Sequence, residues 1–197
     1  MTTIEVLFPL FTDDSRGFLY LNQLLNEINE KDVIVIEGYI EVKDEFEAFL
    51  KNDSNFETFE RDYINKLRDI NPEMEIGQRT SPSFKFILKT LKGKEFQQLN
   101  ILESYKEKVR ITKEGDNWGT IEQRNKLMYQ RLGKIIDEST SNRVITFITQ
   151  AHSRPIKRNI NTSNIFDLNQ YTQTKFKKIE TIKQPFREQS FKIIYSK

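Results

Sequence analysis

Apolar positions near the start of the chain follow two different periods. The stretch Asp32 to Val42 (DVIVIEGYIEV) contains four consecutive β-branched residues, Val33 to Ile36. Such residues lose rotamer freedom in a helix and fit a pleated strand. An unbroken apolar run is typical of a strand that is covered on both faces. Just upstream, leucines and isoleucines recur at helical spacing over residues 18–30, which predicts an amphipathic helix.

The same pattern continues along the chain and predicts a mixed α/β architecture of the α+β class. We expect a central mixed sheet built on strands near residues 4–11, 32–42, 83–89 and 143–150, with amphipathic helices packed on it. The predicted helices cover residues 44–50, 56–70 and 120–139, with Ser54 or Asn55 as the cap of the second. Residues 96–108 fit a further helix and residues 108–112 a short strand. The polar stretch 71–82 is a candidate hinge.

Composition narrows the classes of chemistry. The 197 residues include no Cys and a single His, His152. The chain therefore lacks thiolate catalysis and cysteine-ligated metals, and a multi-histidine metal centre or histidine triad is not expected. No apolar run of membrane-spanning length and no secretory signal are visible, so we expect no membrane association and a cytoplasmic or virion-associated protein.

Charge divides the chain into two regions. Residues 151–197 carry ten lysines and arginines against three carboxylates, whereas residues 1–150 carry 21 basic and 26 acidic residues. We therefore predict an acidic body over 1–150 and a basic, β-rich C-terminal arm over 151–197. An arm of this charge can contact an acidic protein surface or the phosphates of a nucleic acid. The candidate contact residues are Arg154, Lys157, Arg158, Lys175, Lys177 and Lys178.

The end of the central apolar run carries a resemblance to a known family. The segment VIEGYIEV, with Glu37 after a hydrophobic strand, resembles the glutamate-bearing strand of the TOPRIM domain of primases, topoisomerases and related nucleases. The resemblance implies that Glu37 binds Mg²⁺ together with a later acidic pair. The best match for that pair is Glu114-Gly-Asp116, which has Glu where the family has Asp. Oxygen ligands of this kind are what Mg²⁺ requires.

A second carboxylate motif follows a few residues later. Glu41-Val42-Lys43 matches the E-x-K half of a PD-(D/E)xK nuclease, with Asp13 or Asp14 as the upstream acid. That fold presents its acids from adjacent strands, whereas a helix is predicted between these residues. An exposed strand end with alternating charge is the simpler interpretation.

Taken together, these patterns favour a non-enzymatic function. We expect a structural or assembly component of a multi-subunit particle, without a cofactor, which uses the basic arm to contact its own copies or other subunits. The abundance of Asn, Ile, Lys and Phe is typical of AT-rich genomes, including those of phages and mobile elements. Two alternatives stay open: a Mg²⁺-dependent nucleic-acid enzyme using Glu37 and Asp116, and a nucleic-acid-binding module without catalysis.

Overall fold

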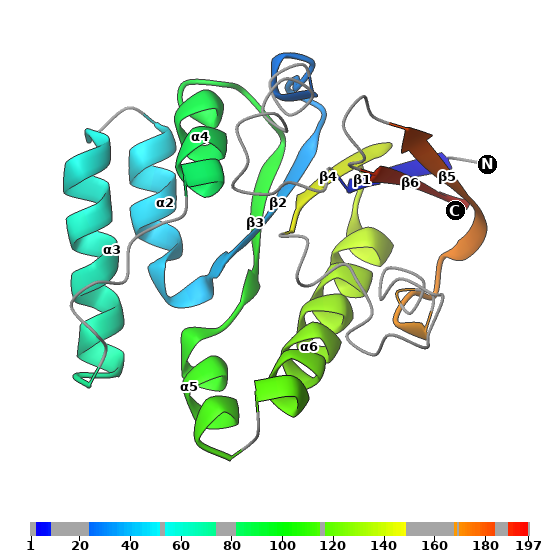
Figure 1. The fold of residues 1–197 in the computed structure, drawn as a ribbon. Helices are drawn as coiled ribbons and strands as arrows, with labels where there is room; N and C mark the ends of the chain where they lie inside the picture. The colour runs from blue at the N-terminus through cyan, green and yellow to red at the C-terminus, as the bar shows by residue number, and fades with distance from the viewer. Residues whose placement is uncertain are drawn as a thin grey trace.

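One mixed sheet with helices on both faces organises the chain (Figure 1). The structure is a computed structural model, and it describes residues 3–8, 24–51, 54–73, 82–114, 117–148, 168, 170–183 and 189–196. In chain order the elements are β1 (Thr3–Phe8), β2 (Val33–Tyr39), the 3-10 turn η2 (Ile40–Val42), α2 (Lys43–Leu50), α3 (Phe56–Ile70), α4 (Pro82–Leu91), β3 (Gln98–Glu103), α5 (Tyr105–Glu114), α6 (Asn117–Glu138), β4 (Arg143–Phe147), β5 (Lys175–Lys183) and β6 (Gln189–Ser196).

The described strands form a six-stranded sheet in the order β3-β2-β4-β1-β6-β5. The first four strands of that order run parallel, with β2 paired to β3 on one side and to β4 on the other. The last two strands are antiparallel, and β6 joins them to the sheet by pairing with β1. The predicted mixed α+β fold is therefore confirmed.

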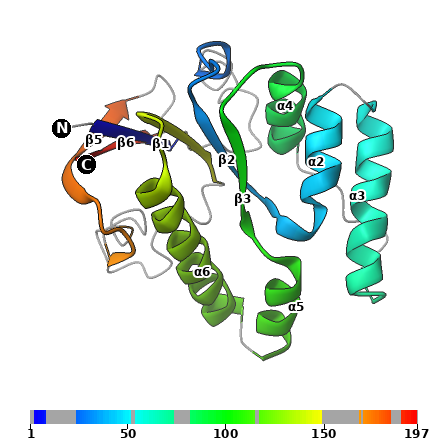
Figure 2. The same cartoon turned by 180° about the vertical axis from the view of Figure 1, so that it is seen from behind.

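Strand β2 is buried on both faces, as its sequence predicts. Ile34 and Ile36 pack into a cluster with the apolar faces of α2, α3 and α4. Val33 and Val35 point to the other face and pack against α6. Because successive side chains of a strand alternate between faces, the helices form two layers with the sheet between them, which Figure 2 shows from behind.

A side-chain cap explains where helix α3 begins. Helix α3 begins after Asn55, whose Oδ1 accepts a hydrogen bond from the Thr58 N–H at 2.8 Å. This is one of the two predicted caps, and the helix covers the predicted residues 56–70. Helix α2 also matches its prediction, while α6 begins at Asn117, three residues before the predicted start.

Two predictions in the middle of the chain were wrong. Residues 83–89 belong to helix α4, and the third strand in the described part of the chain is β3 at residues 98–103, which pairs with β2. Phe84 and Phe86 suggested alternation, but the buried residues of α4 recur at helical steps: Phe84, Ile87, Leu88 and Leu91. The predicted helix over 96–108 and strand over 108–112 are replaced by β3 and α5.

The described parts of residues 151–197 are mainly strands. Strands β5 and β6 form a hairpin that extends the sheet, so this portion of the predicted basic arm is β-rich, as expected. The division into an acidic body and a basic arm stays a prediction, and most of the candidate hinge (74–81) lies outside the described residues. None of the helices in the described ranges is both long and apolar enough to cross a bilayer.

Candidate functional site at the carboxyl edge of the sheet

Parallel strands β2 and β3 end side by side and bring polar residues to one edge of the sheet. Glu37 and Tyr39 come from the end of β2, and Glu103 is the last residue of β3. Tyr39 and Glu103 are register partners, after an irregularity in the pairing that begins at Ile36. The crevice outside the carboxyl ends of parallel strands is the common ligand position in open α/β sheets.

Glu103 is held at the end of β3 by Arg124 of α6, the helix that covers the other face of the sheet from α2, α3 and α4. The side chains of Glu103 and Arg124 are only 6% and 14% exposed. Arg124 Nε donates to Glu103 Oε1, and Arg124 Nη2 donates to Glu103 Oε2 at 3.0 Å. Burial would lower the pKa of Arg124, but its hydrogen bonds to Glu103, together with the charges of Glu103, Tyr39 and Glu37, outweigh burial and raise it. This two-pronged geometry fixes both side chains at the strand end.

Lys108 on α5 reaches the same place. Its Nζ donates to the Tyr39 hydroxyl at 2.5 Å and lies 5.1 Å from the centre of the Tyr39 ring and 6.0 Å from that of Tyr105. Burial lowers the pKa of Lys108, and the nearby Arg124 lowers it further, while Glu103 and Glu37 act in the opposite direction. Lys108 is therefore a partly desolvated amine, which gives up its proton more readily than an exposed lysine.

Phenol groups line the site beside these charges. The Tyr39 ring lies between those of Tyr63 and Tyr105, with ring centres 6.3 and 5.0 Å apart. Burial, followed by the charge of Glu103, raises the pKa of both Tyr39 and Tyr63. Both hydroxyls therefore keep their protons at neutral pH and can act as hydrogen-bond donors.

Glu37 acts electrostatically on the same groups as Glu103. Both carboxylates influence the pKa values of two tyrosines, one lysine and one arginine. We call this set the strand-end cluster; its members are Glu37, Tyr39, Tyr63, Glu103, Lys108 and Arg124. Two carboxylates balance two cations, and neither Glu37, Tyr39, Lys108 nor Arg124 is sealed from solvent. The arrangement brings hydrogen-bonded acids and bases together at the carboxyl ends of two strands, as proton transfer requires.

Glu41, the acid of the E-x-K motif, has a different place. Its Oε1 accepts hydrogen bonds from Ser104 Oγ at 2.6 Å and from the Lys106 N–H at 3.2 Å, and its Oε2 accepts one from the Tyr105 N–H at 2.8 Å. Burial would raise the pKa of Glu41, but these bonds outweigh it and lower the pKa. Glu41 therefore caps the beginning of α5, whose first N–H groups have no partner within the helix.

The acidic pair of the TOPRIM resemblance is only partly visible. Glu114 is the last residue of α5, and Asp116 lies outside the described residues. Within the described ranges, no group of three or more His, Asp or Glu side chains could hold a metal ion. A magnesium site built from Glu37 and Asp116 stays a prediction.

The candidate contact residues of the basic arm are also divided. Lys175, Lys177 and Lys178 lie on β5, the edge strand of the sheet, and Lys177 is exposed. Residues Arg154, Lys157 and Arg158 lie outside the described residues, as does His152.

Five of the six members of the strand-end cluster escaped the sequence analysis, which singled out only Glu37; the five are Tyr39, Tyr63, Glu103, Lys108 and Arg124. A usable signal was present in Ser104-Tyr-Lys-Glu107, which matches the S-x-x-E capping box at a helix start. In the structure the Glu107 N–H donates to Ser104 Oγ at 3.3 Å. Reading that box would have begun a helix at Tyr105 and left Glu103 at a strand end, like Glu37.

Comparison with known proteins identifies no relative. No protein-family model matches the chain, no curated protein is significantly similar to it, and no solved structure matches its fold.

Proposed function

We propose that the protein is an enzyme that performs acid–base chemistry on a small polar substrate at the strand-end cluster. The observation that carries this proposal is the gathering of Glu37, Glu103, Lys108 and Arg124 at the carboxyl edge of β2 and β3. This is a different conclusion from the non-enzymatic one that the sequence alone favours.

Energetics argue that the cluster serves more than stability. Removing charged groups from water costs several kcal/mol per ion, and well-packed apolar residues often stabilise a fold as well or better. If the carboxyl ends of β2 and β3 only had to be covered for stability, two carboxylates and two cations at this position would contribute little. Groups with shifted pKa values, gathered where ligands bind, are characteristic of catalytic sites.

The geometry suggests a role for each group. Glu37 accepts a proton from the substrate, and Lys108, with its lowered pKa, exchanges a proton through the Tyr39 hydroxyl. Arg124 positions Glu103 and supplies positive charge. General acid–base catalysis by one positioned side chain typically contributes about 10²–10⁴-fold in rate.

Activity measurements with the Glu37→Gln variant test this proposal. The substrates are para-nitrophenyl acetate, para-nitrophenyl phosphate and bis(para-nitrophenyl) phosphate, each with and without Mg²⁺. We expect the wild type to hydrolyse at least one of them and the variant to lose roughly 10²–10⁴-fold. Glu122→Gln is the matched control, because Glu122 is an exposed carboxylate on α6. The proposal fails if the wild type hydrolyses none of the three faster than Glu37→Gln does. Mg²⁺-dependent cleavage of the diester alone would favour the TOPRIM-like alternative.

We also propose, as a second candidate function, assembly through the C-terminal hairpin. Strand β5 is the edge of the sheet and contains four lysines and one glutamate, Glu180, which lies opposite Lys192 of β6. Lysines on an edge strand discourage pairing with a further strand. The contact we propose is therefore between these charges and an acidic surface, such as the body of a second copy.

Light scattering on the intact chain tests the assembly function. We expect self-association at low salt that is lost on changing Lys175, Lys177 and Lys178 together to Glu. The control is Lys126→Glu, at an exposed position of α6. A wild type that stays monomeric at low salt would exclude self-assembly through β5.

A further inference from the structure

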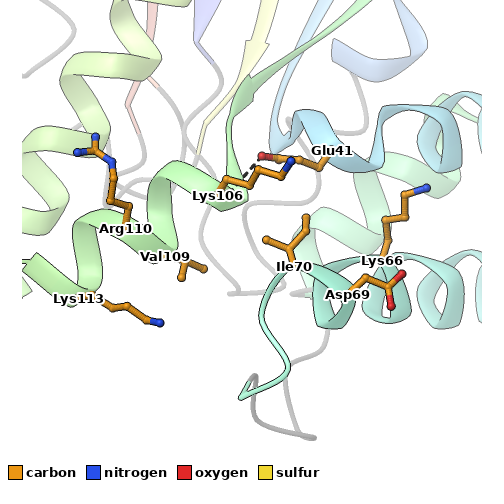
Figure 3. A pocket seen from close by; sticks show the side chains of 8 residues that line it. All are labelled: Glu41, Lys66, Asp69, Ile70, Lys106, Val109, Arg110 and Lys113. Atoms are coloured by element: carbon orange, nitrogen blue, oxygen red, sulfur yellow. Dashed lines mark hydrogen bonds between the residues drawn. The ribbon is translucent and has the colours of Figure 1, made fainter.

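A cavity of about 880 Å³ lies between α3 and α5 (Figure 3). Lys106, Arg110 and Lys113 line it from α5, and Lys66 lines it from α3. The three α5 residues are spaced by four and three positions, so they share one face of that helix. Lys108 of the strand-end cluster lies about half a turn around α5 from them. The cavity and Lys108 therefore lie on different faces of α5.

Positive charge predominates in the cavity. Within the described part of the chain, neither Lys106 nor Lys113 forms an ion pair. Lys66 has a long ion pair with Glu45 at 3.5 Å, and its own side chain is 50% exposed. These cations can therefore reach a ligand without first breaking a strong internal contact.

Two carboxylates also line the cavity, but they do not cancel these charges. Glu41 is already bound by the first N–H groups of α5 and by Ser104 Oγ. Asp69 is on the α3 side of the cavity (Figure 3). The lining therefore carries four basic side chains against two acidic ones, and three of the basic ones come from α5.

An apolar strip completes the cavity. Val109 of α5 and Ile70 at the end of α3 lie between the charged side chains (Figure 3). Small-molecule sites typically have volumes of about 300–1,000 Å³ and combine apolar walls with a few polar groups. The cavity fits that description, with cations at its rim and two aliphatic side chains inside it.

We propose that this cavity binds a phosphate-bearing small molecule of about nucleotide size. Lys106 and Lys113 contact the phosphate oxygens, and Val109 and Ile70 pack against the apolar or ring portion. Arginine and lysine are the side chains that most often bind phosphate groups. A cavity of this volume between two helices suits a discrete molecule, whereas a polymer needs an extended groove. The inference does not depend on the proposed catalytic function.

Calorimetry and amide NMR with defined probes test the inference. The probes are adenosine 5′-monophosphate, pyrophosphate, adenosine and a single-stranded oligonucleotide, at about 0.15 M salt, where interactions between distant exposed charges are largely screened. We expect both phosphate compounds to bind and adenosine not to bind. Amide signals within residues 106–113 and 66–70 should shift.

Substitutions locate the binding. Changing Lys106 and Lys113 together to Gln should weaken binding of adenosine 5′-monophosphate by roughly tenfold or more, since both charge-assisted hydrogen bonds to the phosphate are lost. The control, Lys126→Gln, removes an exposed lysine of α6 and should leave binding unchanged. Circular dichroism confirms that both variants fold. The inference fails if no phosphate compound binds, if Lys126→Gln weakens binding equally, or if the oligonucleotide binds more tightly than the monophosphate.

Discussion

At the residue scale, single carboxylates near the ends of β2 and β3 have distinct tasks. Glu37 and Glu103 act on the same lysine, arginine and tyrosines, whereas Glu41 is committed to the backbone of α5. All three lie at the ends of strand or turn segments rich in apolar residues, and sequence motifs connected two of them, Glu37 and Glu41, with nuclease-type sites. The role of Glu41 follows from its contacts with Ser104 and Tyr105, which are more than 60 positions away in the sequence.

The capping role of Glu41 makes stability depend on pH. The folded-state pKa of Glu41 lies below its ordinary value of 4.5. A depressed pKa means that the ionised carboxylate stabilises the fold above about pH 4.5, and that this contribution is lost as the pH falls through the folded-state value. Glu41→Gln should therefore reduce the free energy of unfolding by about 0.5–2 kcal/mol at neutral pH, the usual cost of losing a cap.

Urea denaturation of both proteins between neutral pH and about pH 3 checks this expectation, because the difference should shrink on the acid side. Glu122→Gln is again the matched control, since its exposed side chain caps no helix. A difference that stays constant over the whole range would contradict the capping role.

At the element scale, α6 is joined to the segment before β5 by a close backbone approach. A methyl group added at Gly133 would lie 2.1 Å from the Tyr171 carbonyl oxygen. Four residues further along the helix, Asp137 accepts hydrogen bonds from the N–H groups of Gln173 and Thr174, both at 2.8 Å. One glycine and one aspartate thus fix where the chain enters the C-terminal hairpin.

Gly133→Ala gives a test in which two effects have opposite signs. In a helix interior, this change normally stabilises by about 0.8–1 kcal/mol through propensity. Here the carbonyl of Tyr171 must move, so we expect a net destabilisation of about 1–3 kcal/mol, as for overpacked sites. Thermal and urea unfolding measure the effect, with the exposed Lys134→Ala as control. A Gly133→Ala variant that is more stable than the wild type would show that the segment is not docked there.

Prediction of helices and strands succeeded where the apolar residues followed one clear period and failed where both the helical and the strand period fitted. The run at Val33 to Ile36 is too β-branched for a helix, and α3 has both a cap and a sustained helical period. Within residues 84–91, the alternation of Phe84 and Phe86 spans only three positions, whereas the helical spacing of buried residues spans all eight. The structure follows the longer pattern and forms helix α4. Leu99 and Leu102 also have helical spacing, yet they lie on opposite faces of β3 in separate clusters. Tertiary packing, which no local pattern contains, makes that choice.

Prediction of the site was limited for the same reason. Glu37 was identified because it directly follows a clear strand. Glu103, Lys108 and Arg124 come from β3, α5 and α6, and their meeting depends on the parallel pairing of β2 with β3. That pairing could not be inferred while the second strand was assigned to residues 83–89.

At the scale of the whole molecule, the last strand closes on the first. Strand β6 pairs with β1 from Thr3↔Ser196 to Phe8↔Phe191. Tyr195 is fully buried and packs in the cluster that α6 forms against the sheet. The C-terminal hairpin therefore contributes to the core that supports β2 and the strand-end cluster.

Removing residues 151–197 should consequently damage the whole fold. The truncated chain would lose Tyr195 from the core and leave β1 as an open edge, which is prone to aggregation.

Tyr195→Ala isolates the packing contribution and should lower the free energy of unfolding by about 3–5 kcal/mol, as for other large aromatic side chains in cores. The triple exchange of Lys175, Lys177 and Lys178 for Glu changes the charge of the same hairpin while keeping its pairing with β1. We expect it to unfold near the wild-type temperature, whereas the truncated chain should show no cooperative transition. A 1–150 fragment that unfolds cooperatively and stays monomeric would instead show that β1 to β4 form the folding unit and that the hairpin is an accessory to it.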